Sequence, residues 1–188
     1  MFQINMDVML LIYFYFEYKF ILMYNNSIVK SINKLLRMCP MTLNIRPTQL
    51  NDLLPLNALM KEYVVGFYNN PWPGDQAIEL LIKNLLDQQI GVQFVAEQDG
   101  ELIGFATLYF TYSTMKANRV AIMNDLFVTE AWREGEAEAR LFEHCQQYTR
   151  EHGCAYMSWI TAATNERAQQ LFERLGATQG TWVSYSIT

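Results

Sequence analysis

The residues best placed to do chemistry lie in one stretch, Ala121 to His144. Its apolar positions predict a buried strand, a short turn and the start of an amphipathic helix. The first backbone N–H groups of a helix have no partner inside it, and the positive end of the helix dipole lies beside them, so such a turn is a ready phosphate site. Glu134, Glu136 and Glu138 fall at this same turn. The stretch therefore predicts an anion site with an unusual excess of carboxylates.

The other reactive side chains form no comparable group. Cys39, Cys145 and Cys154 are an odd number without metal-ligand spacing, which indicates reduced thiols and a cytoplasmic protein. His144 and His152 are the only histidines, so we expect no metal centre. Neither histidine is paired with a cysteine in a nucleophile arrangement, and the chain contains no G-x-S-x-G, Walker or dinucleotide-binding motif.

Composition limits the classes of protein to consider. The chain has 188 residues, of which 51% are hydrophobic, enough for one sizeable core. The formal net charge is −5 and the sequence shows no basic stripe, which argues against a nucleic-acid partner.

Residues 1–40 differ in kind from the rest. They contain no Gly, Ala, Thr, His or Trp, and half of them are Phe, Ile, Tyr, Asn or Lys. The apolar run from 8 to 24 is interrupted by Glu17 and Lys19, which argues against a membrane span. We interpret 1–40 as an atypical N-terminal extension that is not native or is disordered, with a membrane or partner anchor as the alternative. Residues 41–188 are then a single domain of net charge −7, with ten basic and seventeen acidic residues.

Periodicity predicts the element order β-α-α-β-β-β-α-β-α-β, an α/β (α+β) fold with a mixed sheet and helices on its faces. An Asp99-Gly100 turn predicts a hairpin, and Gly176 predicts the end of a helix. The expected strands cover 42–46, 92–97, 102–111, 120–128, 155–160 and 182–187. The expected helices cover about 53–67, 78–86, 137–152 and 165–175.

Three segments carry a family resemblance: NDLFVTEAWR at 124–133, NERAQQLFERLGA at 165–177 and WVSYSI at 182–187. Together with the element order they resemble the GCN5-related N-acetyltransferase (GNAT) family, over about Leu43 to Ile187. The resemblance implies the acyl-CoA N-acyltransferase fold, acetyl-CoA as cosubstrate and an amine as acceptor.

The pyrophosphate loop of that family has the pattern Q/R-x-x-G-x-G/A, in which glycine lets backbone amides close on phosphates. Counted without gaps, Arg133 takes the first position, and Glu136 and Glu138 replace the glycines. A one-residue shift would match Gly135 and Ala137 instead, but it requires an insertion, so we prefer the ungapped match. The implied cofactor contacts are Leu126, Phe127, Val128, Arg133, Glu134, Gly135, Glu136, Ala137, Glu138, Ala139 and Asn165.

The carboxylates of Glu134, Glu136 and Glu138 would repel the negatively charged pyrophosphate of the cofactor. Two like charges about 4 Å apart repel by roughly 1 kcal/mol in water and about 4 kcal/mol at a semi-buried surface. The simpler interpretation is that acidic residues in a first helical turn stabilise the helix, by about 0.3–1 kcal/mol each.

The resemblance also implies catalytic positions. Asp125 in the central strand would accept the amine proton, and Tyr185 is the best remaining hydroxyl, although each also has an ordinary structural interpretation. The tyrosine that often protonates the departing thiolate in the family is matched by Phe172, which has no proton to give. Asn165 would contact the cofactor, cap its helix, or both. Tyr68 and Trp72 fall where the fold lines its acceptor pocket.

The function implied is acetyl transfer from acetyl-CoA to a small-molecule amine by direct attack in a ternary complex. An acidic domain weakly favours a cationic acceptor. The alternative is a degenerate member of the fold that acts as a binding or interaction module, and a membrane-tethered enzyme is a further one. A homodimer is compatible with the sequence.

Overall fold

The computed structural model describes residues 43–88, 90–133 and 135–187. The predicted extension at 1–40 lies outside these residues. Leu43–Thr188 forms one compact unit. Among the described residues, no helix combines the length and hydrophobicity that crossing a bilayer requires.

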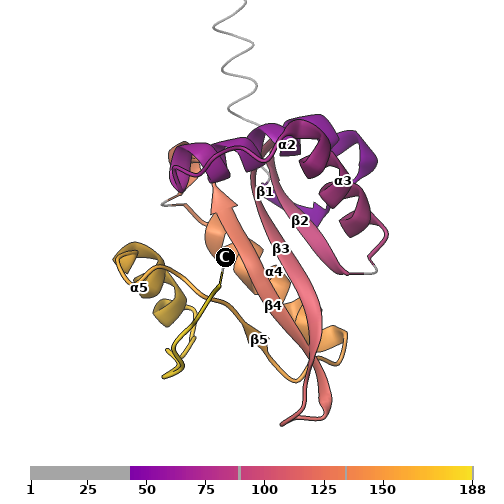
Figure 1. Ribbon diagram of the computed structural model, residues 1–188. Coiled ribbons are helices and arrows are strands. Elements are labelled where there is room, and N and C mark those ends of the chain that lie inside the picture. The colour runs from indigo at the N-terminus through magenta and orange to yellow at the C-terminus, as the bar shows by residue number, and fades with distance from the viewer. Residues whose placement is uncertain (1–42, 89, 134, 188) are drawn as a thin grey trace, which may run out of the picture. The chain divides into compact units, whose positions relative to one another are not determined.

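The core of the unit is one five-stranded sheet, whose strands lie in the order β1-β2-β3-β4-β5 (Figure 1). Strands β1 to β4 are antiparallel, and β5 runs parallel to β4. The β2–β3 turn is the predicted Asp-Gly hairpin, because Asp99 and Gly100 both take positive φ, 53° and 85°. The strands are β1 (Leu43–Pro47), β2 (Gly91–Gln98), β3 (Glu101–Ser113), β4 (Asn118–Val128) and β5 (Met157–Ser158).

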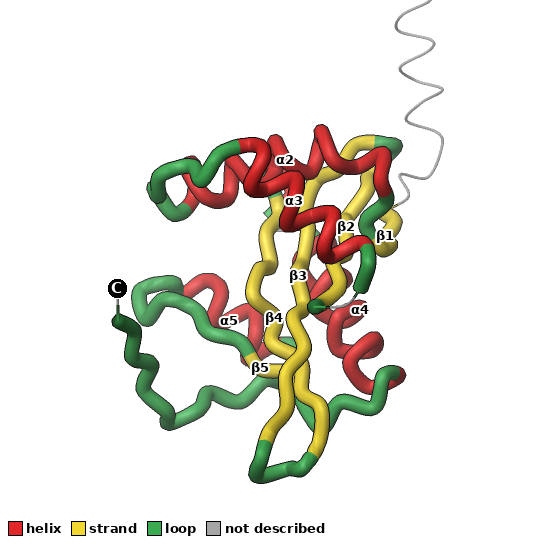
Figure 2. Tube along the Cα trace, turned by 45° about the vertical axis from the view of Figure 1, so that its right-hand side comes forward, coloured by secondary structure: helices red, strands yellow, loops and turns green. Residues whose placement is uncertain are grey.

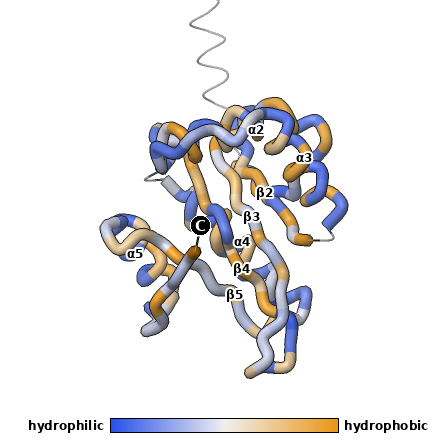
Figure 3. Tube along the Cα trace, viewed as in Figure 1, coloured by the Kyte–Doolittle hydropathy of each residue, from blue (hydrophilic) through white to orange (hydrophobic). Residues whose placement is uncertain are grey.

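Helices cover both faces of the sheet (Figure 2). Val95 of β2 packs with Leu56 and Ile82, whereas its neighbour Phe94 points the other way and packs with Leu141. The two helices on the first face show mixed hydrophobic and hydrophilic positions in Figure 3. The helices are α2 (Leu53–Lys61), continued by the π-helical turn η2 (Glu62–Phe67), α3 (Asp75–Leu86), α4 (Ala137–Glu151) and α5 (Glu166–Arg174), with short 3₁₀ turns η1 (Leu50–Asp52) and η3 (Glu130–Trp132).

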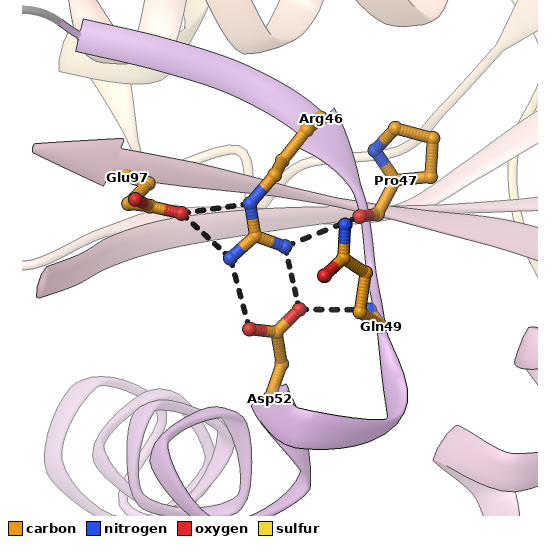
Figure 4. Close-up of polar contacts among 5 residues, drawn as sticks. All are labelled: Arg46, Pro47, Gln49, Asp52 and Glu97. Carbon is orange, nitrogen blue, oxygen red and sulfur yellow. Dashed lines mark hydrogen bonds and ion pairs between the residues drawn. The ribbon is translucent and has the colours of Figure 1, made fainter. Parts of the chain in front are cut away.

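A buried ion-pair network ties the first face together (Figure 4). The Arg46 guanidinium donates to Asp52 at 2.6 and 2.9 Å and to Glu97 at 2.7 Å. The Gln49 backbone N–H donates to the same Asp52 carboxylate at 2.7 Å. Because Arg46 lies on β1, Glu97 on β2 and Asp52 immediately before α2, the network fixes where α2 starts over the sheet.

The predicted order is confirmed up to α5, and the two C-terminal strand predictions need correction. The strand expected at 155–160 pairs with β4 only through Met157 and Ser158. The strand expected at 182–187 does not form; these residues carry no strand pairing, and Trp182 and Tyr185 are each 90% exposed. A strand forms only where another strand offers an edge to pair with. Because β5 is only two residues long, it offers too short an edge, and residues 182–187 remain unpaired despite their alternating pattern.

Candidate active site

The sheet opens at the carboxyl end of β4. Thr107 pairs with Asp125 and Leu108 with Met123, so Asn124 is an extra residue that bulges out of β4. On the other side of β4 the pairing with β5 ends at Ile122 and Ser158. Beyond this point β4 remains paired with β3 on one side, but no described strand continues the sheet on the other side, and that edge of β4 faces a space.

That space is a cavity that is open to solvent. Its walls come from η2, the second half of β4, the start of α4, the segment after β5, and α5. The cavity brings together seven residues predicted from the sequence: Tyr68, Leu126, Phe127, Val128, Arg133, Glu138 and Asn165. The strand residues expected to contact the cofactor and the first position of the predicted phosphate loop therefore line the same cavity.

Arg133 is held against that wall. Its Nε donates to the Val128 carbonyl at 3.0 Å. Its guanidinium carbon lies 4.9 Å from the ring centroid of Phe67 and 5.5 Å from that of Phe127. These contacts orient a cation at the cavity, which is what an anionic ligand requires.

Glu138 reaches the same cavity but is not left unpaired. Both of its carboxylate oxygens accept hydrogen bonds from Arg167 of α5, at 2.7 and 2.8 Å. Glu136 points elsewhere, is largely exposed and lies 3.6 Å from Arg140 one turn along α4. The expected repulsion is thus offset at both positions by a guanidinium; Glu134 lies outside the described residues.

The rest of the described loop does not line the cavity: Gly135, Glu136, Ala137 and Ala139 are not among the cavity-lining residues. The Gly135 N–H donates to the Trp132 carbonyl at 3.2 Å, and the Ala137 side chain is buried in the core. Helix α4 begins at Ala137, and the Glu136 side chain makes no capping hydrogen bond to its first turn. The first N–H groups of a helix have no partner within it and can donate to an anion.

Asp125 is not among the residues that line the cavity, although its neighbour Asn124 is, and the Asn124 Nδ2 donates to the Asp125 Oδ1 at 3.1 Å. Asp125 lies opposite Thr107 of β3. Burial raises the pKa of Asp125, and hydrogen bonds from Thr107, Asn124 and Tyr63 act against that rise without cancelling it. Burial likewise raises the pKa of Tyr63, so its hydroxyl stays protonated.

Of the remaining predicted residues, some line the cavity and others do not. Asn165 caps α5, because its Oδ1 accepts from the Ala168 N–H at 3.2 Å, and it also lines the cavity. Phe172 lines the cavity as well, with its ring 5.1 Å from Trp159. Two residues are not brought to the cavity: the Trp72 indole donates to Asp75 at 2.9 Å, and Tyr185 lies in the exposed tail.

Sequence reasoning missed three polar residues of this region: Arg167, Thr107 and Gln93. Arg167 stands two positions after Asn165, and the only signal for it was that a carboxylate at a glycine position needs a cation. Thr107 and Gln93 become visible only through strand register. Among the described residues, no group of His, Cys, Asp and Glu is suited to a metal ion.

Comparisons with known proteins agree with this geometry. The chain is 32% identical over 146 residues to the uncharacterized N-acetyltransferase YhfO of Bacillus subtilis strain 168, covering 77% of this chain and 97% of the relative. It is 30% identical over 122 residues to the D-amino-acid N-acetyltransferase HPA3 of Saccharomyces cerevisiae, covering 63% and 74%.

Solved structures show the same fold. A probable acetyltransferase superposes with a TM-score of 0.68 at 26% identity, covering 77% of this chain and 97% of the other. The aminoglycoside N-acetyltransferase AAC(6')-Iy in complex with CoA superposes with a TM-score of 0.69 at 22% identity, covering 80% and 97%. The model of the acetyltransferase (GNAT) family matches residues 56–177, and the chain therefore belongs to that family.

Proposed function

We propose that this chain transfers the acetyl group of acetyl-CoA to the amine of a small molecule, by direct attack in a ternary complex. The observation that carries the proposal is the cavity at the open end of β4, which is lined by a fixed cation, Arg133, and lies beside the carboxylate of Asp125, next to the lining residue Asn124. The cation would hold an anion, and the carboxylate would accept a proton. Family membership supports the same reaction class.

The donor set suits CoA. Leu126 and Val128 offer an apolar wall for a pantetheine arm, on the edge of β4 where β5 has ended. The N–H groups at the start of α4, together with Arg133, offer donors to phosphate. The acetyl thioester supplies the activated acyl group when it is bound, and the residues of this chain orient it and shield it from water.

The acceptor side is aromatic. Tyr68 and Phe67 line the cavity beside Tyr63, with ring centroids 4.9 Å apart for Tyr63 and Tyr68. Aromatic faces suit an organic ammonium ion. The yeast relative is named for D-amino acids and one structural neighbour for aminoglycosides, so both classes belong among the acceptors to try.

Two measurements test this function. Isothermal titration with CoA and acetyl-CoA checks the first step, and no heat at millimolar ligand would contradict the proposal. Mass-spectrometric detection of acetylated product, from a panel of D-amino acids, polyamines and aminoglycosides, checks the second. Acetyl-CoA binding without any acetylated amine would restrict the chain to binding.

A specific observation favours one second candidate, a binding module without catalysis. Glu138 occupies a glycine position and lines the cavity, and Phe172 supplies no hydroxyl to a leaving thiolate. For that candidate the two glutamates would block the cofactor, so Glu136→Gly/Glu138→Gly would gain CoA binding that the parent lacks. Equal CoA affinity in the two proteins would contradict it.

A further inference from the structure

Three charged side chains line the cavity, and they come from three different elements. Among the described residues of its wall, only Arg133, Glu138 and Arg167 are ionised at neutral pH. Arg133 directly follows η3, Glu138 lies in the first turn of α4, and Arg167 lies in the first turn of α5. The way these three groups pair decides what charge the cavity presents to a ligand.

Glu138 and Arg167 are paired with each other. The Arg167 Nη1 donates to the Glu138 Oε2 at 2.7 Å, and its Nη2 donates to the Oε1 at 2.8 Å. The Glu138 side chain is buried, whereas the Arg167 side chain is exposed. The guanidinium therefore covers the carboxylate and can itself be reached from the cavity that both residues line.

A planar guanidinium binds a phosphate with the same two-pronged geometry that it uses for a carboxylate. A diphosphate diester, such as the one in CoA, carries one negative charge on each of its two phosphates. Arg133 supplies one positive charge to the cavity, while Glu138 cancels the charge of Arg167. If Arg167 turned from the carboxylate to a phosphate, two cations would face the two anionic groups.

The exchange would not leave Glu138 without compensation. Glu138 is the second residue of α4, and the first turn of a helix carries the positive end of the helix dipole. A carboxylate at that position is stabilised by the helix itself. The pair can therefore open without the full penalty of an isolated buried charge.

We propose that Arg167 is a phosphate-binding residue for CoA, and that Glu138 competes with the phosphate for the Arg167 guanidinium. The inference rests on the proposed acetyl transfer, for which acetyl-CoA is the donor. Before the cofactor binds, Glu138 holds Arg167 at the edge of the cavity. A phosphate then replaces the carboxylate as the partner of the guanidinium, and only hydrogen bonds change. The glutamate lowers the affinity for CoA without abolishing it, because the pair must open first.

The test compares two variants that are both neutral at position 138. If neutralising Glu138 were the only role of Arg167, Glu138→Gln and Glu138→Gln/Arg167→Gln would bind CoA equally. We expect instead that the double variant binds CoA about 10–100-fold more weakly than Glu138→Gln, because it lacks charge-assisted hydrogen bonds to a phosphate. Isothermal titration gives both Kd values. Equal Kd values would overturn the role of Arg167.

Two controls distinguish a phosphate contact from a general effect of the substitution. Pantetheine lacks the phosphates of CoA and should bind equally to the two variants. Glu138→Gln/Arg140→Gln should bind CoA as Glu138→Gln does, because Arg140 lies 3.6 Å from Glu136 in an exposed pair and does not line the cavity. A comparable loss of pantetheine binding, or a comparable loss in the Arg140 variant, would overturn the proposal.

A second readout follows the guanidinium directly. In Glu138→Gln labelled with ¹⁵N-arginine, the Nε signal of Arg167 is assigned by its absence from Glu138→Gln/Arg167→Gln. This signal should shift when CoA is added and stay in place when pantetheine is added. CoA binding without this shift would overturn the role of Arg167 and leave the proposed function intact. A parent that binds no CoA at millimolar concentration would overturn the proposed function, and this inference with it.

Discussion

Glu138 and Arg167 face each other between α4 and α5, and the guanidinium binds both carboxylate oxygens, at 2.7 and 2.8 Å. The Glu138 side chain is only 6% exposed, whereas that of Arg167 is 44% exposed. The pair therefore ties the first turn of α4 to α5, and it holds a second cation beside the predicted phosphate site. A carboxylate at position 138 is compatible with folding because Arg167, 29 residues later in the chain, supplies its partner.

Removing Arg167 should leave the buried Glu138 carboxylate without its partner and destabilise the fold. For Arg167→Gln we expect the free energy of unfolding to fall by about 1–3 kcal/mol, as for a buried polar group that loses its partner. Urea denaturation measures this loss. Glu138→Gln/Arg167→Gln should recover part of it, because the uncompensated charge is gone; strictly additive losses would show that the two side chains do not interact in solution.

Removing the carboxylate should instead improve cofactor binding. In Glu138→Ala, Arg167 loses an anionic partner and the cavity loses a negative charge, so we expect the Kd of CoA to fall by about tenfold, equivalent to about 1.4 kcal/mol. Glu143→Ala, on an exposed position of the same helix, is the control and should bind as the parent does. Isothermal titration gives both constants; equal affinities would mean that Glu138 does not oppose the phosphates.

Local sequence patterns were enough to predict most of the fold. Alternation and turn chemistry located β2, β3 and the Asp99-Gly100 hairpin, and helical spacing located α2 to α5, because these signals depend on neighbours in the chain. The C-terminal tail shows the limit of this reasoning. Residues 182–187 alternate as a strand would, yet they form none, since pairing depends on whether an edge is available.

The candidate site was only partly predictable for a related reason. Arg133 and Asn165 follow from a motif, whereas the alignment of Gln93, Thr107 and Asp125 across the sheet depends on the register of three strands, which no local pattern determines. From the sequence, Tyr63 fits the acceptor pocket and core packing equally well. The structure places it in a π-helical turn, where it both lines the cavity and packs against Phe105.

The Arg46 network should make the fold sensitive to acid. Arg46→Ala leaves Asp52 buried and uncompensated, so we expect a loss of about 3 kcal/mol near neutral pH. Burial alone would raise the pKa of Asp52, but the bonds from Arg46 and Gln49 outweigh it, and the pKa is lowered. Such a group stabilises the fold above its ordinary pKa, near 3.8, and this contribution disappears as pH falls through the lower folded value.

The measurement is urea denaturation of parent and Arg46→Ala between pH 7 and pH 3. The difference between the two proteins should be largest near pH 7 and should already narrow above pH 4, because without Arg46 burial raises the pKa of Asp52 and the variant regains stability as that carboxyl takes up a proton. It should narrow further as pH falls through the lowered pKa of Asp52 in the parent. Lys83→Ala is the control, since Lys83 and Glu79 form an exposed pair 3.7 Å apart and should contribute less than about 1 kcal/mol. A gap that does not change with pH would show that Asp52 keeps its ordinary pKa in the folded protein.

Asp125 should have the opposite pH signature. Burial raises its pKa, so between the unfolded and folded values the native state binds more protons than the unfolded state, and stability falls as pH rises through that window. At pH values above this window the Asp125 carboxylate is charged in the folded protein, and its desolvation lowers the free energy of unfolding. We therefore expect Asp125→Asn, which keeps the shape without the charge, to be more stable than the parent at pH 8 and to lose this advantage toward pH 4. Paired urea titrations at the two pH values measure the difference. A variant less stable than the parent at pH 8 would show that the hydrogen bonds to Asp125 outweigh its desolvation.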